Sequence, residues 1–308
     1  PTPRTHSSAA SDVYKRQELA QGTKQLGPLN NYVALRDGEL YTISIVGQDF
    51  ASNVSEEVSV IDITFDTSPP EIAIEKPQSE SFVNSNQITF SVNEPFTSAK
   101  MIWQGKGLEP QEFVLRDSHL SQGKHILKDY GVRPLEKVFY NIHIEGLDRA
   151  TNLGVSDTLL NVTFDITPPV LTISSPISDS PVNSSQLTLN FSEPLKKGRV
   201  TWVATAGPDP NSPHVRNFSE QDRQQGDKID FIFESPPSLV DGVEYQVVVE
   251  GTDLAGNKGE PFKVNNVFYD ITPPRFTDVE PLDSTFINEA YINYCLLYTS
   301  PSPRDIGE

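Results

Sequence analysis

Acidic and amide side chains recur along this chain at a nearly fixed spacing, and their oxygen atoms are the groups that could do chemistry. The two sets are Asp66, Glu94, Asp148 and Asn152, followed by Asp165, Glu193, Asp253 and Asn257. Calcium prefers about six to eight hard oxygen ligands in a flexible arrangement. Each set therefore predicts a calcium site, provided that the fold brings its members together from separate segments of the chain.

The same side chains also have a plainer use, which the sequence leaves open. Asp148 with Asn152, and Asp253 with Asn257, lie in loops of the form Gly-x-Asp-x-Ala-x-Asn. In turns, Asp accepts amide hydrogen bonds and Asn tolerates left-handed geometry. Turn chemistry alone is therefore the alternative to metal binding, because no contiguous segment supplies all the ligands as an EF-hand loop does.

Three similar strings reveal the repeat that must position these residues. They are "ITFDTSPP" at residues 63–70, "VTFDITPP" at 162–169 and "VFYDITPP" at 267–274. A fixed period of about one hundred residues points to a repeated structural unit. Proline cannot extend a sheet ladder, and it holds the residue before it in an extended conformation. Each double proline thus predicts a short, stiff connector between neighbouring domains of a rod.

Alternating apolar residues predict the strands of each repeat. Strict alternation over this length is typical of half-buried strands. A hairpin is predicted before each connector. The first strands of the two complete repeats are predicted at residues 71–77 and 170–176, and the second strands at residues 86–95 and 185–194. Trp103 and Trp202 occupy one repeated strand position, which predicts two core anchors. About seven short strands in each hundred residues, without a helix, indicate a β-sandwich. The alternating positions of the hairpin are Tyr41, Ile43 and Ile45, then Tyr140, Ile142 and Ile144, then Tyr245, Val247 and Val249.

The repeat resembles a known class of module. Its Leu-x(4–5)-Tyr pattern resembles the tyrosine corner of fibronectin type III and immunoglobulin-like domains. Together with the Asp-Pro-Pro connectors, the Gly-x-Asp-x-Ala-x-Asn loops and the strand Trp, it resembles the tandem bacterial immunoglobulin-like repeats of large surface and secreted proteins. The resemblance implies an all-β chain of tandem immunoglobulin-like, fibronectin III-like sandwiches in a head-to-tail rod, at the cell surface or outside the cell. It also implies junctions that calcium stiffens.

The domain boundaries follow from the connectors. Residues 18–68 are expected to form the C-terminal half of one domain, 69–167 and 168–272 two complete domains, and 273–294 the start of another. Residues 1–17 and 295–308 are expected to be artefacts, because one adapter-like DNA segment can encode both "DVYKRQ" and, on its other strand, "CLLYTS". The remaining chain would then be an internal fragment. Its only cysteine, Cys295, falls in the excluded part, so no disulfide is expected.

Composition and motifs narrow the function classes. With 24 basic and 42 acidic residues, the formal net charge is −18, which disfavours nucleic acid and anionic membrane surfaces as partners. The sequence contains no phosphate-binding loop, nucleophile elbow or zinc spacing. We therefore expect that the chain is not an enzyme. We expect a monomeric rod that serves as a stalk in an adhesin-like protein. Its partners would be an unknown surface ligand or neighbouring domains of the same chain, and its only cofactor would be Ca²⁺.

Two other functions remain open at this point. The repeats could be accessory domains of a large extracellular enzyme, such as a glycoside hydrolase or a protease, whose catalytic domain lies elsewhere. They could also be a carbohydrate-binding module, which would need exposed aromatic side chains. Tyr130, Phe218 and Tyr291 form no repeated pattern of that kind, so this function ranks last.

Overall fold

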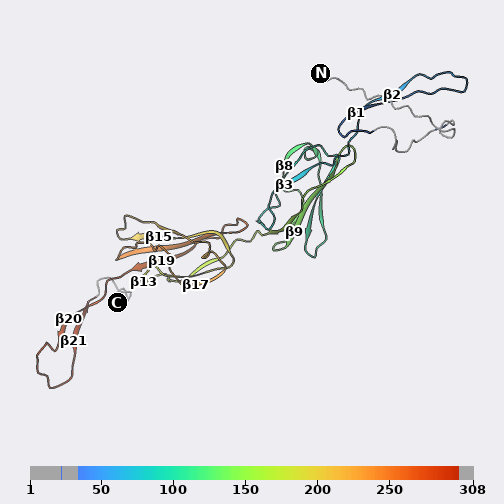
Figure 1. The fold of residues 1–308 in the computed structure, drawn as a ribbon. Helices are drawn as coiled ribbons and strands as arrows, with labels where there is room; N and C mark the ends of the chain where they lie inside the picture. The colour runs from blue at the N-terminus through green and yellow to red at the C-terminus, as the bar shows by residue number, and fades with distance from the viewer. Residues whose placement is uncertain (1–21, 23–33, 298–308) are drawn as a thin grey trace.

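The computed structural model describes residue 22 and residues 34–297, and it is built almost entirely of β-strands (Figure 1). Within the described residues, the only helical element is the single 3₁₀ turn η1 (Asp117–Leu120). No helix in this part of the chain has the length and apolar character needed to cross a membrane. The predicted all-β fold of tandem sandwiches is confirmed.

The first sandwich has one sheet of three strands and one of six. The smaller sheet has the order β3-β5-β8, and the larger has the order β4-β11-β9-β6-β7 with β10 paired to β9. The strands are β3 (Ile72–Lys76), β4 (Phe82–Val83), β5 (Ile88–Val92), β6 (Ser98–Gly105), β7 (Gln111–Val114), β8 (Gly123–Leu127), β9 (Phe139–Leu147), β10 (Leu153–Val155) and β11 (Leu159–Phe164).

The second sandwich repeats this plan. Its sheets have the orders β12-β14-β17 and β13-β19-β18-β15-β16. The strands are β12 (Leu171–Ser175), β13 (Ser180–Val182), β14 (Leu187–Phe191), β15 (Leu195–Ala206), β16 (His214–Asn217), β17 (Gly226–Phe231), β18 (Val243–Asp253) and β19 (Phe262–Tyr269).

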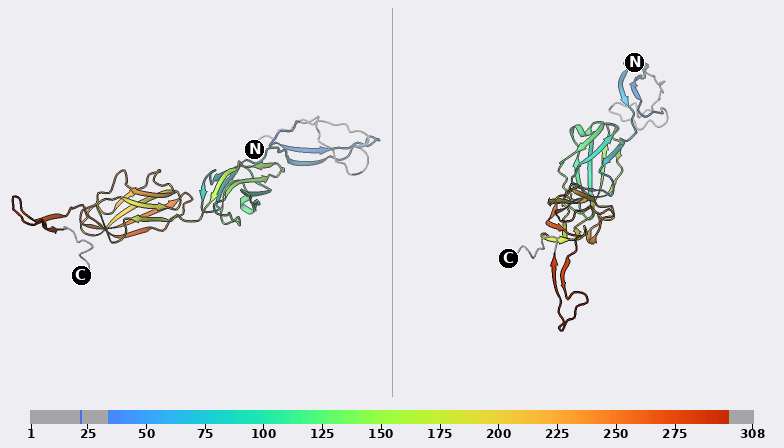
Figure 2. Two further views of the ribbon diagram at one scale, coloured as in Figure 1. Left: turned by 90° about the horizontal axis from the view of Figure 1, so that it is seen from below. Right: turned by 90° about the vertical axis from the view of Figure 1, so that its left-hand side faces the viewer.

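A two-stranded hairpin flanks the sandwiches on each side. β1 (Leu40–Ile45) pairs with β2 (Val58–Thr64), and β20 (Arg275–Glu280) pairs with β21 (Asn293–Leu297). The four units follow one another in a row, and two perpendicular views show the same order (Figures 1 and 2). Residues 295–297, which we expected to be part of an artefact, complete β21. The other residues expected to be artefacts lie outside the described residues.

Each sandwich has its own core around one Trp and one Tyr. Trp103 and Trp202 are fully buried, as are Tyr140 and Tyr245. The indole and phenol rings of each pair meet edge to face, with centroids 5.6 Å apart in the first sandwich and 6.0 Å in the second. Burial of such large rings dominates core energetics, so the prediction that the Trp residues are core anchors is confirmed.

The tyrosine corner is also present in the first hairpin and in both sandwiches. The Tyr140 hydroxyl accepts a hydrogen bond from the Leu135 amide at 2.7 Å, and Tyr245 accepts one from Val240 at 2.9 Å. In the first hairpin, Tyr41 accepts the equivalent bond from Arg36 at 2.6 Å. These bonds fix the start of the strand that leads to the Gly-x-Asp-x-Ala-x-Asn loop.

A bulge in the last strand explains an irregular spacing in the sequence. Asp62, Asn161 and Asn266 all have positive φ, at 58°, 54° and 54°. The register shifts at each of these positions, and Asn and Asp tolerate such angles better than β-branched residues do. As a result, Val264 and Val267 are both buried in the core, although residues three positions apart in a regular strand point to opposite faces.

A short parallel strand ties each connector that leaves a sandwich to that sandwich. β4 pairs in parallel with β11, and β13 pairs in parallel with β19. The backbone amide of Asp165 donates to the carbonyl of Val83 at 2.9 Å, and that of Asp270 donates to Val182 at 2.9 Å. The connector Asp is therefore held at the C-terminal pole of its own domain before the chain enters the next one.

Candidate metal centres at the domain junctions

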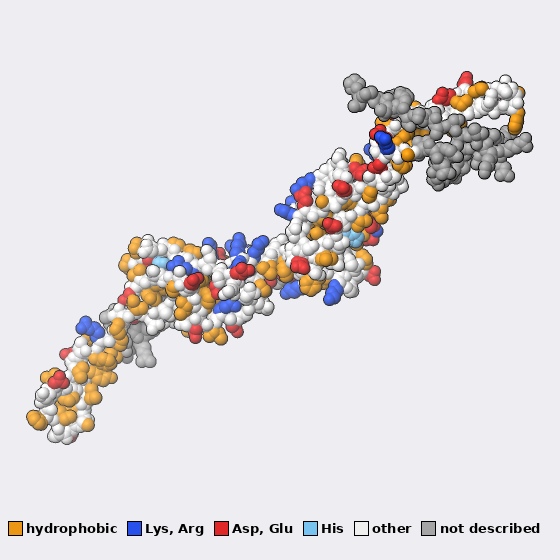
Figure 3. All heavy atoms as spheres, viewed as in Figure 1, with side chains coloured by type: hydrophobic (Ala, Val, Ile, Leu, Met, Phe, Trp, Pro, Cys, Tyr) orange, Lys and Arg blue, Asp and Glu red, His pale blue; other side chains and the backbone are white. Residues whose placement is uncertain are grey.

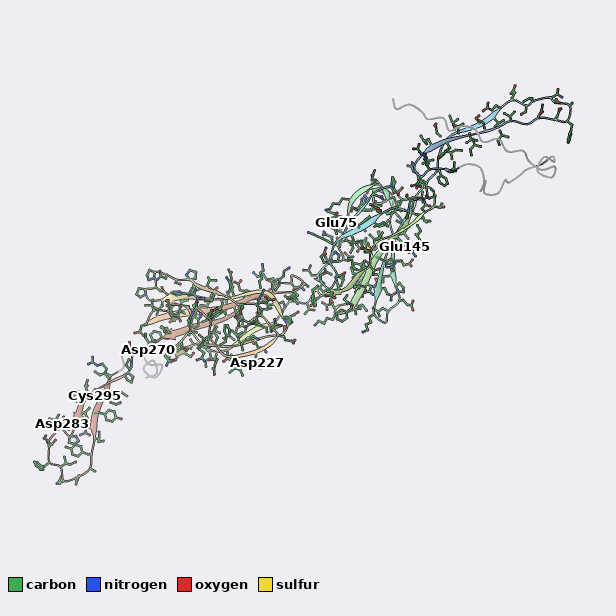
Figure 4. All side chains as sticks on the ribbon, viewed as in Figure 1. Glu75, Glu145, Asp227, Asp270, Asp283 and Cys295 are labelled. Atoms are coloured by element: carbon green, nitrogen blue, oxygen red, sulfur yellow. The ribbon has the colours of Figure 1, made fainter. Side chains whose placement is uncertain are left out.

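The connector Asp forms a local turn with one of its two carboxylate oxygens. Oδ1 of Asp66 accepts the amide of Ser68 at 3.1 Å, and Oδ1 of Asp165 accepts the amide of Thr167 at 3.0 Å. Asp270 makes the same bond to Thr272 at 2.9 Å, and Figure 4 places Asp270 where the second sandwich meets the last hairpin. Because only Oδ1 is used by this bond, Oδ2 is left for other partners.

The Thr before the double proline has a partner that the sequence did not reveal. The hydroxyl of Thr167 donates to Glu136 at 2.8 Å, and that of Thr272 donates to Asp241 at 2.6 Å. These hydrogen bonds are the main cause of the lowered pKa of Glu136 and of Asp241. The accepting carboxylate precedes the Thr by 31 residues in both cases, so each connector is fixed from the side as well as through its backbone.

The Gly-x-Asp-x-Ala-x-Asn loop closes on its own Asp. The backbone amide of Asn152 donates to Oδ1 of Asp148 at 2.9 Å, and the side-chain amide donates to Oδ2 at 2.8 Å. Asn257 makes the same two bonds to Asp253, both at 2.8 Å. The equivalent Asp and Asn of the first hairpin form the same loop. The loop therefore forms by turn chemistry, whether or not a metal binds beside it.

The predicted carboxylates converge at both junctions. Each residue of the trio Asp66, Glu94 and Asp148 offers an oxygen within 4.8 Å of the others, and so does each residue of the second trio. Asp148 and Asp253 are only 1% exposed. In each trio, one carboxylate comes from the connector and two come from the domain that follows, where one lies in the loop after β5 or β14 and the other lies at the end of β9 or β18. The second trio is Asp165, Glu193 and Asp253.

The electrostatics of these trios are unfavourable without a cation. Burial raises the pKa of Glu94, and the neighbouring charges of Asp66 and Asp148 raise it further. Burial likewise raises the pKa of Glu193, with added contributions from its two aspartates. Like charges that share a partly desolvated site disfavour ionisation. A bound cation would offset this repulsion and favour the ionised form of Glu94 and Glu193.

The two asparagines brace the boundary through their nitrogen atoms. The side-chain amide of Asn152 donates to the carbonyl of Asp66 at 3.2 Å, and that of Asn257 donates to Asp165 at 2.8 Å. Oδ1 of Asn257 accepts a hydrogen bond from Asn84 at 3.2 Å. The sequence pattern predicts both asparagines as oxygen ligands. In the structure they lie at the predicted junctions, but as hydrogen-bond donors to the connector.

The donor set fits calcium better than a transition metal. Each trio consists of carboxylates alone, without the His or Cys ligands that zinc prefers. Calcium accepts hard oxygen ligands in flexible geometry and completes its shell with backbone carbonyls and water. Asp66, Glu94 and Asp148, with their equivalents at the second junction, are the residues that would hold the ion. Metal binding itself stays a prediction.

The connector packs so closely against the sandwich that follows that there is no room for a side chain at two glycine positions. A Cβ atom added to Gly154 would overlap the carbonyl of Pro70, and one added to Gly259 would lie 2.5 Å from the carbonyl oxygen of Pro169. Only glycine lets the backbone approach this closely. Pro70 and Pro169, the second prolines of the first two connectors, therefore pack directly against the sandwich that follows.

A buried polar cluster in the second sandwich lies far from these trios along the strands. Oδ2 of Asp209 lies 2.6 Å from Nε2 of His214 and accepts a hydrogen bond from the Tyr245 hydroxyl at 2.7 Å. The side chains of Asp209 and His214 are 0% and 7% exposed. A substrate has no access to groups buried this deeply, so the cluster is best explained as part of the packing. The aromatic residues Tyr130 and Phe218 are also buried, whereas Tyr291 is exposed.

No protein-family model and no curated protein sequence matches this chain. Similar solved structures include the fibronectin(III)-like modules of Clostridium thermocellum CbhA, at 14% identity over 65% of this chain and 94% of that chain, with a TM-score of 0.33. The FN1–FN3 domains of chicken CNTN1 are 12% identical over 77% of this chain and 78% of that chain, with a TM-score of 0.31. A chain of a 1.5-MDa bacterial ice-binding adhesin is 13% identical over 76% of each, with a TM-score of 0.29. These similarities concern the fold alone.

Proposed function

We propose that this chain is a non-catalytic structural and adhesive spacer, a stalk that works outside the cell as part of a large bacterial surface or secreted protein. The observation that supports it best is the construction of the junctions. Each connector that enters a sandwich is hydrogen-bonded to the domain it leaves, as through Asp165 and Thr167, and to the sandwich it enters, as through Asn257. A connector that is hydrogen-bonded to both neighbouring domains keeps those domains aligned. The two ends of the chain are therefore held far apart.

Calcium bound at both junctions would strengthen the link between neighbouring domains. The connector carboxylate and the two carboxylates of the next sandwich belong to different domains, so an ion bound between them would link those domains. Extracellular calcium modules bind with dissociation constants of about 10⁻⁴ to 10⁻³ M. A site of that affinity fills where calcium is abundant, so the rod would be stiffest outside the cell.

Small-angle scattering of the full chain, in EDTA and in millimolar calcium, tests both parts. The spacer proposal predicts an elongated particle in both buffers, and calcium stiffening predicts a longer maximum dimension when calcium is present. The double variant Asp165→Asn with Asp253→Asn should lose the calcium effect at one junction. A compact particle would contradict the spacer, whereas an elongated particle without a calcium response would contradict only the metal sites.

A further inference from the structure

A depression of about 380 Å³ lies on the outer face of the larger sheet of the second sandwich. Its polar lining comes from β15, β16, β18 and the hairpin that follows β18. Figure 3 shows Lys and Arg side chains gathered on this sandwich toward the end that faces the first one. The polar residues that line the depression are Lys197, Arg199, Asn217, Glu250, Thr252 and Lys258.

Strand register places two lysines on either side of one threonine. Thr252 pairs with Lys197 of β15, and across a single bridge it pairs with Lys258. Neighbouring strands lie about 4.8 Å apart, so the two lysine backbones are about 10 Å apart with Thr252 between them. Flexible lysine side chains rooted at that separation can bring both ammonium groups to one anion above the threonine.

The depression is basic although the chain is strongly acidic. Glu250 holds Arg199, with Oε2 lying 2.7 Å from Nε and 2.6 Å from Nη2, and Oε1 lies 3.7 Å from Nζ of Lys258. Lys197 makes no ion pair among the described residues. The lining thus contains three cations and one carboxylate, a formal charge of about +2, in a chain of net charge −18.

The first sandwich lacks this excess of positive charge on the same face. Lys100, at the position of Arg199, lies 3.0 Å from Glu112 and 3.1 Å from Glu145. Register places Ser98 where the second sandwich has Lys197, and Leu153 follows the loop where Lys258 does. Two cationic positions are thus neutral in the other repeat, so the shared fold does not require them.

We propose that this depression binds the carboxylate of an acidic saccharide, such as a uronic acid residue. Lys197 and Lys258 would contact the carboxylate, because charge-assisted hydrogen bonds to ammonium groups favour anions. Asn217 and Thr252 would bond the sugar hydroxyls. A volume of about 380 Å³ lies at the lower end of the range of roughly 300 to 1,000 Å³ typical of small-molecule sites. The lining has no aromatic side chain, so neither a nucleic-acid base nor the apolar face of a sugar ring can stack here. Binding would therefore rest on the contacts to the carboxylate and the hydroxyl groups, unlike the aromatic stacking expected of a carbohydrate-binding module. This binding goes beyond the spacer role and does not depend on calcium.

An NMR titration of the full chain in EDTA buffer, with D-galacturonate as the probe and D-galactose as the neutral analogue, tests the site. We expect galacturonate to shift the amides of Gly198, Asn217 and Gly251, with a dissociation constant in the millimolar range typical of exposed charge pairs. Galactose should leave these amides unchanged. The face of the first sandwich, represented by Ala99 and Gly146, should not respond to either sugar.

The double variant Lys197→Ser with Lys258→Leu introduces the residues of the first sandwich and should weaken galacturonate binding at least tenfold. Lys196→Ser is the matched control, because Lys196 is exposed beside the site but does not line it. It should bind as the parent does.

Equal binding of galactose, equal shifts on the first sandwich, or an equal loss in the control would each overturn the proposal. So would a double variant that changes self-association in sedimentation but not galacturonate binding.

Discussion

The side-chain amide of Asn257 donates a hydrogen bond to the backbone carbonyl of Asp165 at 2.8 Å, across the boundary between two sandwiches. The same Asn also donates to Asp253 of its own loop at 2.8 Å. One residue thus joins two of the three carboxylate-bearing segments of the junction. Asn152 makes the corresponding bonds at the first junction. Hydrogen bonds within the protein therefore hold both boundaries without a bound ion.

Replacing Asn257 by Ala should loosen the second junction without unfolding either sandwich. The variant removes hydrogen bonds to Asp165 and Asp253, each with a net contribution of about 1 kcal/mol. We expect the relative orientation of the two sandwiches to vary more, as measured by NMR residual dipolar couplings. Asn53→Ala is the matched control, since Asn53 closes the same loop in the first hairpin. An unchanged orientation in the Asn257 variant would contradict a bracing role.

Calcium should raise the melting temperature of the chain by mass action. An ion that binds only the folded state stabilises it by RT ln(1 + [L]/Kd), about 1.4 kcal/mol at ten times Kd. Asp165→Asn with Asp253→Asn keeps the shape of both side chains and removes two charges, so it should abolish the increment at the second junction. Differential scanning calorimetry with millimolar calcium checks this, and magnesium serves as the control ion. A melting temperature independent of calcium would leave turn chemistry as the only role of these residues.

The sequence predicted the parts of this fold that depend on local pattern. The tyrosine corners, the buried Trp103 and Trp202 and the position of the connectors all follow from periodicity and proline chemistry. The strands β4 and β13 were missed, because two or three residues are too few to show an alternation. The partnership of Thr167 with Glu136 was also missed, since it joins distant segments that only the folded sheet brings together. The carboxylate trios could be predicted because the fold class fixes which loops share a pole. The orientation of each Asn amide could not, since nitrogen and oxygen lie at equivalent positions of one side chain.

Replacing Gly259 by Ala should disturb the packing of the connector against the second sandwich. The added Cβ would lie 2.5 Å from the carbonyl oxygen of Pro169 and 2.7 Å from Leu171. Backbone atoms at that distance must move, and overpacking of this kind costs about 1 to 3 kcal/mol. Chemical denaturation should show a destabilised second sandwich. Lys258→Ala, one residue earlier and exposed, should have little effect, and equal stability of both variants would show that the close approach is not needed.

Replacing Asp209 by Ala should destabilise the second sandwich at neutral pH. Burial alone would raise the pKa of Asp209, but hydrogen bonds from Tyr245 and His214 outweigh that effect and lower it below its ordinary value of 3.8. Removing the carboxylate leaves those two buried partners unsatisfied, at a cost of about 1 to 3 kcal/mol. Asp227→Ala is the control, because Asp227 makes a single exposed side-chain bond to Asn190 on the same sandwich.

The effect of Asp209→Ala should also depend on pH in a defined direction. A carboxyl whose pKa is lower in the folded state contributes stability that is fully present above its unfolded pKa and is lost as pH falls through the folded value. The difference in unfolding free energy between the parent and Asp209→Ala should therefore be largest near pH 7 and shrink below about pH 4. Urea unfolding at a series of pH values, followed by the amide NMR signals of the second sandwich, measures it. A difference that stays constant down to pH 3, or that grows on acidification, would mean that the ionised carboxylate of Asp209 does not stabilise the fold.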